Sequence, residues 1–485
     1  MSSSPEQSGK LPFTFGIEIE FLFGVDNVQV SSDPAHRHLL VENSIIHDDD
    51  LYDPEFEVLQ VADLGDVAGL FQAATVLRRN GADLLIRTEA KSDDEDFSRW
   101  TMTLEAMVPH PESDSQLAAL TDGKYRRVVD CSFAGLELIS PILKVPDMTN
   151  LEPNGLVEVN QFLQLMAGEQ PGPCFFSATP KNASVHVHIG VPPTPEGDSV
   201  DIPLNALRHL AWICIAFEDV ITLLHHPERH GYVNSKIWPN AQPNRVFLGR
   251  NDPLEPLHNC AEKGRPFYPQ EEFAKIFNFE YCDEDMDRKE LKHLLCFRMG
   301  PLSGYPTERT FVNFANIVPF PGDPAHAKKT IEFRQHHGTL SAEDISEWVL
   351  FVTALVRAAE RKADESPSQT DLPVEFIDKV IEAQGNYAKQ LLTFQQAWKY
   401  ADILHCKERS MKELFDLLEL PLERRQYWWN RAMKFASEEF LEYRRMSTCD
   451  PPCQNLPMRD CAGWEEGELI PQPWDTVQSC RSCKR

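Results

Sequence analysis

The sequence predicts a protein of the α+β class, in which strands of alternating apolar and polar residues are accompanied by amphipathic helices. The clearest strand covers residues 13–23, where Phe15, Ile17, Ile19 and Phe21 alternate with small or charged residues. Similar patterns predict strands at 84–87, 100–108, 126–142, 183–190, 311–319 and 328–340. Apolar residues at steps of three and four predict helices at 56–80, 154–165 and 204–224, after Ser341, and across much of 374–445.

The composition is that of a soluble globular protein. The chain has 485 residues, of which 42% are hydrophobic and 25% charged, so it can bury a large core and form more than one domain. The formal net charge of -28 argues against broad nucleic-acid binding, because that function needs a basic face. An anionic substrate would have to enter a locally positive pocket formed by a metal ion, Arg or His.

Several features favour a cytoplasmic location and leave a nuclear one open. Residues 1–12 are expected to be disordered, and the polar start of the chain has no apolar h-region of a signal peptide. The most apolar long run, 204–224, is interrupted by charged residues, so we expect a buried helix and no membrane span. Seven cysteines are scattered singly between Cys131 and Cys406, as reduced core cysteines usually are.

The last segment, 447–485, is rich in proline and holds five of the 12 cysteines. Four of them could form a tetrahedral thiolate zinc site: Cys449, Cys453, Cys480 and Cys483. The spacing is irregular and Cys461 is left over, so a loosely ordered tail is the alternative.

Two carboxylates share one face of the first predicted strand. Because successive side chains of a strand point to opposite faces, Glu18 and Glu20 lie on the same side, roughly 6–7 Å apart. They should repel each other unless a divalent cation, which prefers oxygen ligands, lies between them. The alternative is a strand whose polar face simply meets water.

Two later strands repeat this arrangement with other residue types. His186 and His188 share a strand face, and imidazole binds metal ions when neutral and phosphate when charged. Glu332 and Arg334 also share a face, where a simple ion pair between them is the alternative. Glu137 lies within a further apolar strand, where an ordinary edge-strand glutamate is the alternative.

These residues together make a set of four carboxylates, two imidazoles and one guanidinium. The set fits two divalent cations and a polyphosphate, with the carboxylates and one histidine holding the metal ions. The arginine would bind a phosphate through two parallel hydrogen bonds.

At these residues the sequence resembles the amidoligase family, which belongs to the carboxylate–amine ligase superfamily with glutamate–cysteine ligase and glutamine synthetase. The motifs that carry the resemblance are Gly16-x-Glu18-x-Glu20, Gly135-x-Glu137-x-x-Ser140-Pro141, His186-Val187-His188-x-Gly190 and Glu332-Phe333-Arg334-Gln335-His336-x-Gly338-Thr339-Leu340. The last motif is the most specific. The resemblance covers about residues 13–360 and looks most like the fungal members of the family. Ser184 and Val185 depart from it, because the family often has a glycine before its His-x-His motif.

The resemblance implies a strongly curved antiparallel sheet like the catalytic core of glutamine synthetase, with helices outside and the site on the concave face. The corresponding amidoligase-like catalytic domain would span residues 13–362. A helical extension at 373–446 and the Cys/Pro-rich tail at 447–485 would follow it. The resemblance also implies ATP with two or three Mg²⁺ ions, for which Mn²⁺ could substitute.

Metal ligands follow from the resemblance residue by residue. Glu18 and Glu20 would each bind a different metal ion. Glu137 would join one of these ions, and His186 and Glu332 would join the other.

The resemblance also implies the catalytic and cofactor-binding residues. His188 would lie near the nucleotide phosphates. Arg334 would contact the transferring phosphoryl group, with Glu332 as the second catalytic residue. Catalysis would then consist mostly of positioning and charge neutralisation.

The expected reaction joins a carboxylate to an amine through an acyl phosphate made from ATP. The substrates would be small molecules or peptides, and no nucleic acid or membrane partner is expected. One alternative is a phosphotransferase that phosphorylates a small substrate without forming an amide. The other is a non-catalytic binding or scaffold protein on a degenerate ligase fold.

Overall fold

The structure, a computed structural model, describes a large part of the chain up to residue 365 and two helices beyond it. The described residues are 11–28, 64–88, 97–146, 155–167, 174–180, 182–194, 200–217, 220–221, 224–226, 288, 312–317, 329–365 and 411–435. They form seven α-helices and one nine-stranded sheet, a mixed α/β architecture.

The strands are β1 (Thr14–Asp26), β2 (Leu84–Arg87), β3 (Trp100–Leu104), β4 (Cys131–Ile139), β5 (Leu143–Lys144), β6 (Cys174–Phe176), β7 (Ser184–Gly190), β8 (Val312–Asn313) and β9 (Ile331–His337). The helices are α2 (Leu64–Arg79), α3 (Asp114–Leu120), α4 (Gly155–Met166), α5 (Leu204–Ala216), α10 (Ala342–Glu365), α13 (Met411–Leu417) and α14 (Leu422–Phe435).

The sheet has the order β2-β3-β4-β1-β7-β9-β8, with β5 and β6 also paired to β1. Each pair is antiparallel except β2 with β3, so the predicted antiparallel sheet is present with one parallel pair at its edge. The sheet is open and uncurled, which corrects the expected strong curvature. In the described part of the chain its two edge strands, β2 with four residues and β8 with two, do not pair with each other, so the sheet does not close around a site.

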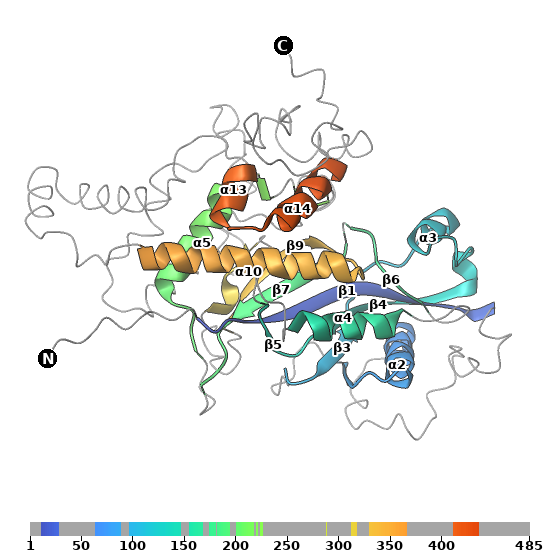
Figure 1. Cartoon of the computed structure of the whole chain (residues 1–485). Helices are drawn as coiled ribbons and strands as arrows, with labels where there is room; N and C mark the ends of the chain where they lie inside the picture. Colours follow the sequence, from blue (N-terminus) through green and yellow to red (C-terminus); the bar gives the residue numbers. More distant parts are fainter. Residues whose placement is uncertain are drawn as a thin grey trace, which may run out of the picture.

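One face of the sheet carries the main hydrophobic core. The alternation in β1 sends Phe15, Ile17 and Ile19 to this face, where they are buried. There they form one core with apolar residues of α2, α4, α5 and α10, to which α13 and α14 also contribute. Figure 1 shows α10 lying along this side of the sheet, with α13 and α14 beyond it. All the described helices except α3 therefore lie on one side of the sheet, and polar side chains of the strands point to the other side.

A second, smaller core closes one end of the opposite face. Leu22 lies on the same face of β1 as Glu18 and Glu20, since side chains of a strand alternate. It packs with Leu117 of α3 and with Tyr125, both buried. The polar part of this face is thus bounded by apolar packing where β1 continues past Glu20.

Ser341 is the N-cap of α10. Its Oγ accepts a hydrogen bond from the backbone N–H of Asp344 at 3.3 Å. The Asp344 carboxylate accepts hydrogen bonds from Tyr427 and Arg431 of α14. The start of α10 is therefore joined to the C-terminal helices by side chains.

Some predictions concern residues outside the described ranges. These are residues 1–10 of the predicted disordered segment 1–12, the zinc site in 447–485, and the parts of the extension 373–446 other than α13 and α14. Cys131 has a free thiol, as expected for a reduced cysteine. Within the described part of the chain, no helix combines the length and the apolar character needed to cross a membrane.

Candidate functional site

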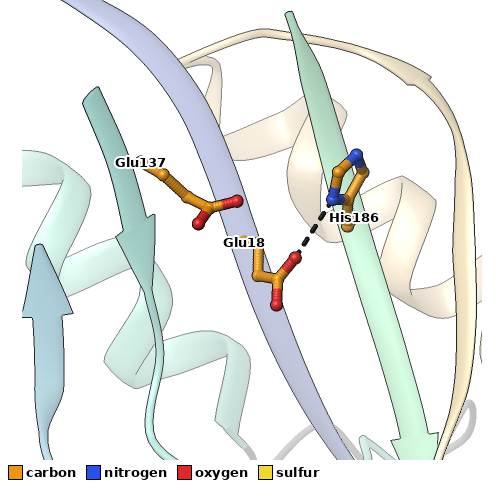
Figure 2. Close-up of side chains that lie close together, drawn as sticks. All are labelled: Glu18, Glu137 and His186. Carbon is orange, nitrogen blue, oxygen red and sulfur yellow. Dashed lines mark hydrogen bonds and ion pairs between the residues drawn. The ribbon is translucent and has the colours of Figure 1, made fainter. Parts of the chain in front are cut away.

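Strands β1 and β7 bring a glutamate and a histidine face to face. The strands are antiparallel, and Glu18 lies directly opposite His186. Nδ1 of His186 is 3.1 Å from Oε2 of Glu18. Figure 2 marks this contact with a dashed line. Nε2 of the same ring is 3.6 Å from Oε1 of Glu20. One buried imidazole therefore lies between two carboxylates of the same strand.

Strands β7 and β9 add the second histidine and a third glutamate. His188 lies directly opposite Glu332. Its Nε2 is 3.0 Å from Oε1 of Glu18, and its Nδ1 is 3.3 Å from the hydroxyl of Thr330. Oε1 of Glu332 is 3.4 Å from Nδ1 of His186. Residues of three neighbouring strands thus converge on one small volume.

Glu332 is buried, and neighbouring side chains keep its carboxylate anionic. Its Oε2 accepts a hydrogen bond from Asn313 of β8 at 2.7 Å, and its Oε1 is paired with Nη1 of Arg334. Burial alone would raise the pKa of Glu332, but Arg334, His188 and His186 outweigh it and the pKa is lowered. Burial lowers the pKa of Arg334, yet the nearby carboxylates reverse this and the pKa is raised. The pair is therefore a carboxylate and a guanidinium, both charged.

Strand β4 places another carboxylate against β1. Glu137 lies directly opposite Glu20, and Thr103 of β3 lies on its other side. Oε2 of Glu20 accepts a hydrogen bond from the backbone N–H of Ser184 at 2.6 Å. Like charges directly opposite each other destabilise an antiparallel pair. A cation bound between Glu20 and Glu137 would offset the repulsion between their carboxylates.

Glu105, just after β3, belongs to the same site and was missed from the sequence. Carboxylate oxygens of Glu20, Glu105 and Glu137 all lie within 4.8 Å of one another. Burial raises the pKa of Glu105, and Glu20 acts in the same direction. A signal was available: alternation along β3 puts Glu105 on the same face as Thr103, the neighbour of Glu137.

Gly135 in β4 allows Glu105 to approach the sheet. The N–H of Glu105 donates to the carbonyl of Gly135 at 2.9 Å. A Cβ at Gly135 would lie 2.5 Å from the carbonyl oxygen of Glu105 and 2.8 Å from that of Val108. Such contacts are too short for any side chain, so the glycine is required for the close packing of this turn.

A β-bulge shapes the end of β9. Val187 pairs with Phe333 and Val185 with His336, so two residues, Arg334 and Gln335, lie opposite His186 alone. Such an extra residue bends a strand and reverses the alternation beyond it. His336 consequently lies on the helix-covered face, opposite the buried Val185. Arg334 stays beside Glu332 on the site face.

The residues fit divalent cations. Three groups in the described residues offer ligand atoms within 4.8 Å of one another: Glu18, Glu137 and His186; Glu18, His188 and Glu332; and Glu20, Glu105 and Glu137. Nε2 atoms of His186 and His188 are buried without a hydrogen-bond partner, although each faces a carboxylate. The five carboxylates outnumber the nearby cations, and carboxylate oxygens are ligands that suit Mg²⁺ or Mn²⁺.

The structure brings all the predicted site residues together on one side of the sheet. They are Glu18, Glu20, Glu137, His186, His188, Glu332 and Arg334, from β1, β4, β7 and β9. Figure 2 shows the side chains of three of them, each from a different strand, pointing toward one another. Their separate roles as ligands, phosphate contacts and catalytic residues remain predictions.

Comparison of the chain with protein-family models, with curated proteins and with solved structures gives no match.

Proposed function

We propose that this protein is an ATP- and Mg²⁺-dependent ligase that joins a carboxylate to an amine. The observation that carries the proposal is the convergence of five carboxylates, two imidazoles and one guanidinium on one face of the sheet. Such a set matches a polyphosphate with its metal ions better than it matches a neutral ligand. The resemblance to amidoligases in the four motifs supports the same reading.

The proposed reaction has two steps. A carboxylate oxygen of the first substrate attacks the γ-phosphorus of ATP, so an acyl phosphate forms and ADP leaves. The nitrogen of the second substrate then attacks the acyl carbon, phosphate leaves, and the nitrogen loses a proton to give the amide. Mg²⁺, when bound, supplies charge neutralisation for the phosphates.

The residues of β9 would bind and orient the transferring group. Oε1 of Glu332 pairs with Nη1 of Arg334, and Oε2 of Glu332 accepts a hydrogen bond from Asn313. These contacts fix the guanidinium before a ligand binds. A fixed guanidinium stabilises developing phosphoryl charge without reorganisation during the reaction. In this proposal His188, oriented by Thr330, faces the phosphates.

The glutamates would hold the metal ions. Glu20, Glu105 and Glu137 offer an all-oxygen set, which suits Mg²⁺. Glu18 contacts both histidines and so connects this set to the β9 residues. The finer fold assignment, a core like that of glutamine synthetase, belongs to the same proposal and is supported by the antiparallel pairing of β4, β1, β7 and β9 around these residues.

The test is the thermal stability of the purified chain with ATP, with Mg²⁺ and with both. A ligand that binds only the folded state stabilises it by about 2.7 kcal/mol at a hundredfold over its Kd. We expect a shift that needs nucleotide and metal together and is lost in Glu18→Ala and Glu332→Gln. Glu360→Gln is the matched control, since Glu360 of α10 is equally buried but pairs with Arg357 away from the site.

The outcomes separate the alternatives. Release of ADP with consumption of a free amine, found by screening acid–amine pairs, supports the ligase. Release of ADP without loss of amine would favour the phosphotransferase. No shift under any condition would contradict ATP binding and favour a non-catalytic protein.

A further inference from the structure

A buried arginine of α14 reaches the end of β9. Arg431 is 9% exposed. Its Nη2 is 2.9 Å from Nε2 of His336 and 3.1 Å from Nδ1 of His337. Its Nη1 donates to Oδ1 of Asp344 at 2.8 Å, and its Nε donates to the carbonyl of Leu224 at 3.2 Å. One guanidinium therefore joins β9, α10, α14 and the segment beyond α5.

Hydrogen-bond chemistry fixes the state of the two imidazoles. A guanidinium only donates, so Nε2 of His336 and Nδ1 of His337 must both accept and carry no proton. Nδ1 of His336 is 2.8 Å from the carbonyl oxygen of His337, which only accepts, so this nitrogen carries the proton of the ring. Both histidines are thus held neutral and in one orientation by Arg431.

The same strand carries the proposed catalytic residues. His336 follows Arg334 by two positions and Glu332 by four, with the bulge between them. Upstream of the bulge, β9 is fixed by pairing with β7 and β8. Downstream, His336 and His337 pair with Val185 and Ser184, and the N–H of Gly338 donates to the carbonyl of Ala183 at 2.7 Å. Arg431 contacts the side chains of both histidines. A bulge weakens the ladder locally, so its position depends on how firmly its two flanks are held.

We infer that Arg431 is a positioning residue for the site. It fixes the C-terminal end of β9 and, through the bulge, the placement of Glu332 and Arg334. The helix α14 is then part of the unit that carries the site, although it contributes no residue to it. The consequence for metal binding rests on the proposed function, whereas the consequence for β9 does not.

Lysine cannot replace this arginine, and a second arginine offers a matched control. The ammonium of lysine is a single nitrogen, which cannot reach two imidazoles and a carboxylate at once. Arg424 lies on the same helix and pairs with the buried Glu347 of α10. Arg424→Met thus removes a similar link between α14 and α10 and leaves the end of β9 held.

The first measurement is amide hydrogen exchange of the full-length protein, followed by mass spectrometry of peptides that cover residues 329–340. We expect exchange of β9 to be at least tenfold faster in Arg431→Met and intermediate in Arg431→Lys. Arg424→Met should leave β9 unchanged while it loosens α14. Unchanged exchange in Arg431→Met, or equal effects of the two methionine variants on β9, would overturn the inference.

The second measurement is binding of Mn²⁺ alone, counted by electron paramagnetic resonance. Glu332→Gln and Glu137→Gln assign the ions bound through β9 and through β4. We expect Arg431→Met to weaken the ion that depends on Glu332 about tenfold, the size of effect typical of groups that orient ligands, and to spare the ion that depends on Glu137. A general loss of stability would weaken both.

The two proposals fail in different measurements. A wild-type protein that binds no Mn²⁺ would contradict the proposed function and the link from Arg431 to metal binding. Faster exchange of β9 with both ions bound normally would overturn that link alone. Unchanged exchange would overturn the role of Arg431 whatever the Mn²⁺ result.

Discussion

At the scale of single residues, burial and charge decide which protonation states the fold tolerates. Glu332 is buried yet anionic, because Arg334 and two histidines surround it. His209 of α5 shows the opposite case. Burial lowers its pKa to about 4, and Lys362 and Arg208 add to the effect. A buried imidazole with so low a pKa stays neutral at pH 7, so it makes folding sensitive to acid.

His209 predicts a stability loss between pH 6.5 and 4. Because its pKa is about 4 when folded and ordinarily 6.5, the unfolded chain binds the proton first as the pH falls. The contribution is fully present above pH 6.5, declines by about 3 kcal/mol down to pH 4, and is constant below. His209→Gln should show a smaller decline over this window in urea unfolding at several pH values.

An exposed histidine provides the control for this measurement. His110 is 44% exposed in its side chain and lies near Asp66. His110→Gln should decline with pH as the wild type does. A His209→Gln profile that parallels the wild type throughout would contradict the assignment.

At the scale of elements, glycines determine how closely the strands and turns of the site pack. Gly135 and Gly16 both belong to motifs recognised in the sequence, but their surroundings differ. A Cβ at Gly135 would collide with two backbone carbonyl groups, whereas at Gly16 its nearest neighbour would be Oγ of Ser140 at 3.8 Å, an ordinary contact. The two positions therefore tolerate substitution differently.

Gly135→Ala should displace the turn that carries Glu105. Overpacking against backbone costs about 1–3 kcal/mol, and the turn must move away from β4 to relieve it. We expect a lower urea midpoint and, in the Mn²⁺ experiment, weaker binding of the ion that depends on Glu137. Gly16→Ala is the control and should stay within about 1 kcal/mol of wild type, the cost of a tolerated core change. Equal effects at both positions would contradict the packing argument.

Strands with long alternation were predictable, and short elements were not. The patterns in 13–23 and 183–190 predicted β1 and β7, because a half-buried strand must repeat every two residues. β6, with three buried residues, and α3, with seven residues, are too short to show a period. The parallel pairing of β2 with β3 depends on the path of the chain between them, which no local pattern specifies.

The site was predictable where chemistry and alternation coincided. Glu18, His186 and Glu332 were recognisable because an ionisable side chain in an apolar strand is costly to bury unless it is paired or binds a metal ion. Alternation along 100–108 puts Glu105 on the face of Thr103, but it was missed because only the pairing of β3 with β4 shows that this face belongs to the site. Arg431 could not be found, since its importance comes from contacts with residues nearly a hundred positions away in sequence.

At the scale of the whole molecule, one hydrophobic core joins the sheet to the C-terminal helices. Phe15 of β1, Trp348 of α10 and Trp428 of α14 belong to the same cluster of buried residues. The ring of Trp428 lies 4.8 Å from that of Phe351 and 6.3 Å from that of Trp348. The described part of the chain should therefore unfold together.

Trp428→Ala should destabilise the whole core and not α14 alone. Removal of a buried tryptophan side chain costs about 3–5 kcal/mol. Because the cavity opens in a shared core, we expect urea transitions followed by far-UV circular dichroism and by fluorescence to shift together. Leu422→Ala, at a half-exposed position of the same helix, should shift them little. An early, separate transition of the variant would contradict a shared core.

The bulge in β9 also determines where that strand can change length. Along a regular strand, a deletion of one residue carries every later side chain to the other face. Deletion of either Arg334 or Gln335 would not have this consequence. It would remove the bulge and leave a regular ladder in which Phe333 and His336 keep their partners on β7. The strand therefore contains one joint at which its length is adjustable. A relative or redesigned chain that is one residue shorter there would keep Glu332 on the site face and His336 among the helices, so alignments of this motif should allow a gap at that point.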